Sequence, residues 1–105
     1  MTPEAVADLL PAIPDWSLAA DGTEIVRRFA QPDFGRGFAL VARIAALAEA
    51  AGHHPDLGLG WGYVTASLRT HAIQGLHLND FILAARIDQA FDDQTSGDRS
   101  PVDRP

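Results

Sequence analysis

Apolar positions recur with the spacing of a helix in three stretches of the chain and with the alternation of a strand in the stretches between them. Between Phe34 and Ala51 they fall three or four residues apart, which is the period of an amphipathic helix. Asp33 is suited to cap the start of this helix, and Gly52 is suited to end it. The apolar side chains expected on its core side are Phe38, Val41, Ile44, Ala45, Leu47 and Ala48.

Two further helices are predicted near the ends of the chain. The first begins after Thr2, whose hydroxyl can cap it. The second begins at Asn79 or Asp80, either of which can cap it, and runs to about Phe91. The remaining residues, 92–105, are polar and rich in acids, and they are predicted to form a disordered tail.

Alternating apolar and polar residues predict strands in two places. Residues 16–31 are expected to form a hairpin, because an Asp-Gly turn signal stands near their middle. Arg27 interrupts the alternation of the second strand of this hairpin. Residues 63–71 are expected to form a half-buried strand that reaches His71, preceded at 57–61 by a shorter strand or an irregular segment.

This order of elements, α-β-β-α-β-β-α, predicts an α+β fold. Helices that alternate with antiparallel pairs are typical of a small antiparallel sheet, here four-stranded, with helices packed on one face. Residues 1–91 are expected to form a single domain, since a chain of 105 residues is too short for two. A core of this size is modest, which makes self-association a natural way to bury more surface.

Composition and charge narrow the possible functions. The formal net charge is −6, and all eight basic residues are arginines, outnumbered by fourteen acids. This balance argues against nucleic acid and anionic membrane surfaces as partners. The chain has no cysteine, which rules out disulfides and thiolate chemistry. With no signal peptide and no apolar run of about twenty residues, the protein is expected to be cytoplasmic.

Three of the four histidines, His53, His54 and His71, fall close together in the sequence. His53 directly follows the predicted end of the central helix, and Glu49, four residues earlier, can reach it if the last turn persists. Histidine ionises near neutral pH, so one imidazole can both give and take a proton. The sequence therefore predicts a histidine site for proton transfer where the helix end meets the following strand.

The residues from Glu49 to Pro55 read Glu-x-x-x-His-His-Pro, and Trp61, His71 and Asp80 follow at regular spacings. This set resembles the signature of the pterin-4a-carbinolamine dehydratases over most of the chain. The sequence departs from the usual pattern of that family at three positions that the resemblance places in the pocket wall: Gly52, Leu57 and Arg69.

The resemblance implies an enzyme that eliminates water from a 4a-hydroxytetrahydropterin to give a quinonoid dihydropterin, in support of pterin cofactor recycling. It implies His53 and His71 as the acid and base, without deciding which is which, and Glu49 as an orienting residue for His53 or a partner of the pterin. His54 is implied in catalysis mainly through binding and orientation. The other residues implied in substrate binding are Pro55, Trp61, Thr70 and Asp80. No metal and no organic cofactor are implied, and a homodimer or homotetramer is expected.

Other interpretations stay open. A non-catalytic interaction or assembly-factor module could share this fold, because a fold does not determine a function. A zinc-dependent hydrolase is a lesser alternative, since three histidines and an acid also suit that ion. Asp80 can serve simply as a helix cap, and His77 is expected to be structural or exposed to solvent.

Overall fold

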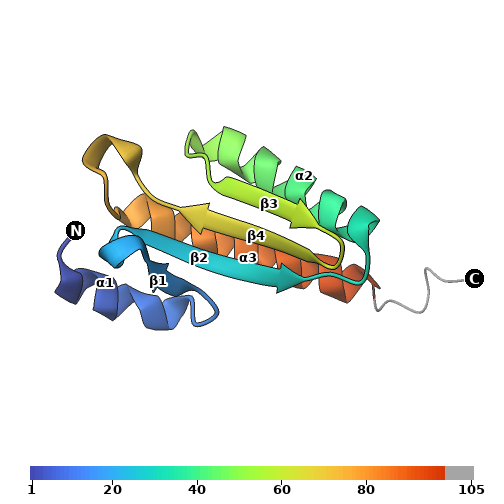
Figure 1. Cartoon of the computed structure of the whole chain (residues 1–105), viewed down its shortest axis with the longest axis horizontal. Helices are drawn as coiled ribbons and strands as arrows, with labels where there is room; N and C mark the ends of the chain where they lie inside the picture. The colour runs from blue at the N-terminus through green and yellow to red at the C-terminus, as the bar shows by residue number, and fades with distance from the viewer. Residues whose placement is uncertain (99–105) are drawn as a thin grey trace, which may run out of the picture.

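A computed structural model describes the backbone of residues 1–98 and the side chains of residues 1–95. Its four strands form one antiparallel sheet in the order β1-β2-β4-β3. The strands are β1 (Ser17–Ala19), β2 (Glu24–Ala30), β3 (Asp56–Gly60) and β4 (Tyr63–Leu68), and the helices are α1 (Pro3–Leu9), α2 (Phe34–Ala51) and α3 (Leu78–Asp98). Figure 1 shows α2 and α3 on the same side of the sheet. The predicted α+β class and the order of elements are confirmed.

The core lies between this sheet and the two long helices. Phe29 and Val64 are direct partners across β2 and β4, and both are buried. They belong to one cluster with Ile44 of α2 and Ile87 of α3, each fully buried. No helix in residues 1–98 is long and apolar enough to cross a bilayer.

Both ends of α2 were predicted correctly, because the residues that begin and end this helix act on backbone groups nearby. Asp33 accepts a hydrogen bond from the backbone N–H of Arg36 at 2.8 Å, and Gly52 follows the helix in the left-handed conformation. The predicted core side of this helix was partly wrong, since Phe38 is 61% exposed and Leu40 is buried. The buried residues of α2 are Gly37, Leu40, Ile44 and Ala48, and this stripe turns Phe38 away from the sheet. At Gly37 the helix packs closely on β3, since an added Cβ would lie 2.8 Å from Cδ1 of Leu59 and would make that side chain move.

Arg27, which interrupted the predicted alternation, lies on the core side of β2. Its guanidinium pairs with Asp88 of α3 and stands 4.4 Å from the ring centre of Phe29. Asp88 also accepts a hydrogen bond from Nε1 of Trp16 at 2.8 Å. The arginine is thus compatible with the core, because its charge is paired and its stem packs on aromatic rings.

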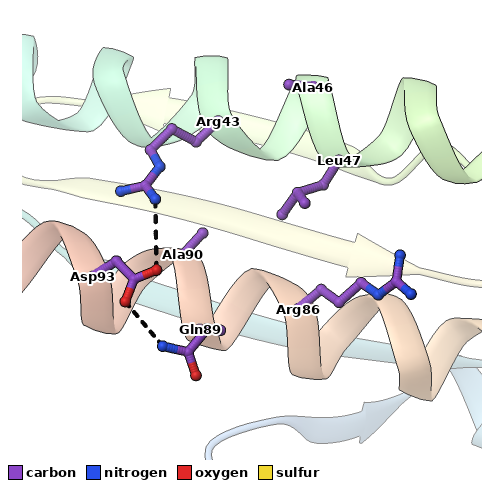
Figure 2. Close-up of a pocket in the computed structure, with 7 residues that line it drawn as sticks. All are labelled: Arg43, Ala46, Leu47, Arg86, Gln89, Ala90 and Asp93. Atoms are coloured by element: carbon purple, nitrogen blue, oxygen red, sulfur yellow. Dashed lines mark hydrogen bonds and ion pairs between the residues drawn. The ribbon is translucent and has the colours of Figure 1, made fainter.

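The predicted disordered tail is wrong for its first part, because α3 continues to Asp98. Two contacts attach these last turns to α2. The side chain of Gln94 donates to the carbonyl of Arg36 at 2.9 Å, and Arg43 pairs with Asp93 at 3.7 Å, as Figure 2 shows for the second contact. The rest of the predicted tail, residues 99–105, lies outside the described residues.

Candidate active site

The histidines that stand together in the sequence line one pocket of about 420 Å³. Three segments form it: the turn after α2, the first residue of β3 and the loop after β4. Its lining residues are Gly52, His53, His54, Pro55, Asp56, Arg69, Thr70, His71 and Ala72. A separate hollow of about 430 Å³ lies between α2 and α3, and Figure 2 shows that its lining contains no histidine. The chemistry of the side chains therefore favours the histidine pocket as the site.

Gly52 produces the sharp turn that carries the chain from α2 into the pocket. Its φ of 64° is left-handed, and the next backbone N–H, that of His53, still donates to the carbonyl of Ala48 at 3.2 Å. Pro55 disfavours a helical backbone at the residue before it, which is His54. The turn therefore sends the two neighbouring histidines to different partners.

We expect Gly52→Ala to destabilise the protein by about 1 kcal/mol, because a left-handed backbone is strained for residues other than glycine. An added Cβ would meet no atom within 4 Å, so the cost comes from the backbone alone. For a domain of this size, Tm should fall by roughly 4–8 °C in a thermal melt. An unchanged Tm would show that the turn does not need a glycine at position 52.

Asp80 holds His53 in place. This carboxylate is fully buried in the first turn of α3, and one of its oxygens contacts Nε2 of His53. Its other oxygen accepts hydrogen bonds from the hydroxyl of Thr70 and from the backbone N–H of His77, both at 2.9 Å. Since an ionised carboxylate accepts and does not donate, we expect the proton of a neutral His53 on Nε2, which leaves Nδ1 as the other ring nitrogen.

Asn79 or Asp80 was predicted to cap the start of α3, but the capping residue is His77, directly before the helix. Nδ1 of His77 accepts from the backbone N–H of Asn79 at 3.1 Å, while Asp80 reaches back to the backbone N–H of His77. This reciprocal arrangement is a capping box. It gives His77 a structural role, in agreement with the expectation for that residue.

Glu49 contacts Nε2 of His54, so the predicted contact between Glu49 and His53 is not formed. The side chain of His54 is 61% exposed and that of Glu49 is 76% exposed. A contact so exposed contributes little to stability. The reason is geometric: the left-handed Gly52 ends the helix before His53, and His53 turns inward to Asp80.

His71 reaches the pocket from a short 3-10 turn, residues 71–73, and not from a strand as predicted. β4 ends at Leu68, and the backbone of Thr70 instead pairs with Gly75, whose carbonyl accepts from the N–H of Thr70 at 2.8 Å. The imidazole of His71 is exposed at the pocket edge, with no hydrogen-bond or ion-pair partner among the described side chains.

Trp61 does not line the histidine pocket. It stands in the turn between β3 and β4, at the end of that hairpin away from the histidines, and it is 75% exposed. Asp56 lines the pocket and was not singled out from the sequence, because an acid at the first residue of a strand carries no distinctive signal. Within residues 1–95, no three histidine, aspartate or glutamate side chains are placed to hold a metal ion.

Fold and pocket together define a small α+β protein with an imidazole-lined site suited to proton transfer. The chain belongs to the pterin 4 alpha carbinolamine dehydratase family, whose model matches residues 1–90. The resemblance seen in the sequence is therefore confirmed at the level of the family.

Individual relatives agree with this assignment. A protein of Methylococcus capsulatus, named provisionally as a pterin-4-alpha-carbinolamine dehydratase, is 42% identical over 89 residues, which cover 85% of this chain and 78% of the relative. A Halorhodospira halophila protein with the same provisional name is 44% identical over 88 residues, covering 84% and 81%.

Solved structures show the same fold. A transcriptional coactivator/pterin dehydratase from Brucella melitensis matches with a TM-score of 0.81 at 27% identity, over 86% of this chain and 96% of that one. A pterin dehydratase-like protein described as a RuBisCO assembly factor in the alpha-carboxysome matches with a TM-score of 0.64 at 26% identity, over 73% and 89%.

Proposed function

We propose that the chain is a dehydratase that eliminates water from a 4a-hydroxytetrahydropterin to give the quinonoid dihydropterin. The observation that carries this proposal is that His53, His54 and His71 line one pocket, with His53 held by the buried Asp80. Membership of the family supplies the substrate class. A pocket of about 420 Å³ lies within the range of small-molecule sites and has room for a bicyclic ring.

The reaction requires two proton transfers. The C–O bond at the tetrahedral ring carbon breaks, and the hydroxyl leaves as water after a general acid protonates it. A ring N–H loses its proton to a general base, and its electron pair forms the new C=N bond. Each such transfer contributes about 10²- to 10⁴-fold to the rate.

His53 and His71 are the residues we propose for these transfers. Asp80 fixes the orientation and tautomer of His53, which leaves Nδ1 to exchange a proton. His71 has no competing partner among the side chains of residues 1–95 and is open to solvent, so it can exchange its proton with water between turnovers. His54, steadied by Glu49, is proposed to contact and orient the pterin together with Pro55 and Thr70.

The proposal predicts that the purified protein accelerates dehydration of freshly generated 4a-hydroxytetrahydropterin. The appearance of quinonoid dihydropterin, followed by absorbance, should be much faster than in buffer alone. Activity is expected to persist after dialysis against a chelator. Loss on chelation, with recovery on adding zinc, would contradict metal-free histidine catalysis and favour a zinc-dependent enzyme.

The same preparation should be tested for partner capture, because one structural neighbour is described as an assembly factor. A protein that captures a partner and gives no acceleration would support the interaction-module alternative. Self-association also stays a prediction, to be measured by light scattering; β1 and β3 are the edge strands available for it.

A further inference from the structure

Arg69 is the arginine in the wall of the histidine pocket. It is half-buried, and its guanidinium has no hydrogen-bond, ion-pair or ring partner among the described side chains. Other arginines of the sheet are partnered: Arg27 pairs with Asp88, and Arg28 stacks over the ring of Tyr63 at 4.9 Å. Arg69 is only partly exposed, and a cation without a protein partner in a pocket wall is suited to bind an anionic ligand.

The backbone on either side of Arg69 is held in place. Leu68 is the last residue of β4, is fully buried and pairs with Ile25 of β2. Thr70 is anchored by its hydroxyl to Asp80 and by its backbone to Gly75. Arg69 thus projects from a backbone held in place on both sides, next to the residue that contacts Asp80, so its guanidinium can reach the same pocket as the imidazoles.

Nearby acids do not neutralise Arg69. Asp56 lines the same pocket, and Glu24 lines a neighbouring hollow that shares Asp56, yet neither lies within 4.0 Å of the guanidinium as an ion pair. These acids also disfavour anions that are not placed directly on the arginine. The positive charge of Arg69 is therefore available in the pocket wall for a ligand.

We propose that Arg69 binds an anionic group, a phosphate or a carboxylate, on the side chain of the pterin substrate. This inference rests on the proposed function, and it adds a preference among pterins to it. The pterin ring lies against the three imidazoles, and its side chain extends along the pocket wall to the guanidinium. Arginine suits this task because its planar fork can donate two parallel hydrogen bonds to either anion.

The test compares three 4a-hydroxytetrahydropterins that share the ring and differ at the end of the side chain: a hydroxyl, a phosphate or a carboxylate. For the wild type, kcat/KM should be roughly tenfold higher for an anionic substrate than for the neutral one, as a charge-assisted hydrogen bond provides. The phosphate and carboxylate arms show which anion is preferred. The preference should weaken as salt is added, because the site is partly open to solvent.

In Arg69→Gln, the ratio of kcat/KM for the anionic substrate to that for the neutral one should fall to about one. Arg69→Lys should keep part of the ratio, since it retains the charge and loses the fork. Arg28→Gln removes the same charge from β2 outside the pocket and should leave the ratio as in the wild type.

Oxidised pterins with the same side chains give a second readout that needs no turnover. Their affinities, measured by pterin fluorescence, should show the same preference and the same dependence on Arg69. If the wild type dehydrates the neutral pterin and shows no preference in either assay, the inference about Arg69 is wrong and the proposed function stands. If no pterin is dehydrated and none binds, both are wrong.

Discussion

Replacing His53 with alanine is expected to lower kcat/KM for pterin dehydration by about 10²- to 10⁴-fold, the usual contribution of one general acid or base. His53 is the imidazole with a fixed orientation, because Asp80 holds its Nε2. Solvent water cannot replace it efficiently, since water lacks a fixed position beside the substrate. The measurement is the rate of quinonoid dihydropterin formation at matched protein concentration.

His77 provides a matched control for this experiment. It is the histidine outside the pocket, and it caps α3 through Nδ1. His77→Asn keeps a capping acceptor, so the fold and the activity should remain close to the wild type. Retention of full activity by His53→Ala would contradict the proposed acid–base role, and an equal loss in both variants would point to a structural effect.

The helices and the turn before the site could be predicted because their signals are local. Asp33 and Gly52 stand at the two ends of α2, and each acts on backbone groups a few residues away. The same holds for Thr2, which accepts a hydrogen bond from the N–H of Ala5 at 3.1 Å. The clustering of the histidines was also visible, because the turn at Gly52 and the following hairpin bring residues 53 and 71 back together.

The features that were missed depend on partners far away in the sequence. Arg27 looked like a break in a strand because its partner, Asp88, is 61 residues further on. The exposure of Phe38 depends on which side of α2 packs on the sheet, and that side runs through Gly37 and Leu40. The last turns of α3 are polar and would be unstable alone, but Gln94 and Asp93 attach them to α2. In each case tertiary contacts overrode the local pattern.

In the candidate site, too, some features could be predicted from the sequence and others could not. Membership of the pocket followed from the motif for His53, His54 and His71, but the pairing of acids with imidazoles did not. Glu49 is closest in sequence to His53 and contacts His54, whereas Asp80, 27 residues beyond His53, contacts it directly. The prediction paired Glu49 with His53 because residues four apart are neighbours on a helix. It was wrong because the helix ends at Gly52, before it reaches His53.

Asp80→Asn is expected to lower kcat by roughly tenfold to a hundredfold. Losses of this size are typical when an imidazole loses the partner that orients it. The amide oxygen can still accept from Thr70 and from the N–H of His77, so α3 keeps its capping box. The amide nitrogen then faces Nε2 of His53 and donates to it. A neutral His53 is then expected to carry its proton on Nδ1, the reverse of the tautomer that an ionised Asp80 favours in the wild type.

The tautomer can be observed directly, which separates a positioning role from a merely structural one. In the wild type, ¹⁵N chemical shifts should place the proton of neutral His53 on Nε2, and in Asp80→Asn on Nδ1. Adding His53→Ala to Asp80→Asn should cause no further loss beyond that of His53→Ala alone, because both changes act on one unit. Wild-type activity in Asp80→Asn, or an unchanged tautomer, would contradict this account.

Asp80→Ala should have a different consequence, namely a large loss of stability. It leaves the hydroxyl of Thr70 and the N–H of His77 without their acceptor, and it removes the partner of His53. The two donors are part-buried, and losing both hydrogen bonds costs about 2 kcal/mol, so Tm should fall by roughly 10 °C. Asp80→Asn should melt much closer to the wild type, because it retains an acceptor for both donors. Equal melting temperatures for the two variants would show that the hydrogen bonds from Thr70 and His77 to Asp80 do not stabilise the start of α3.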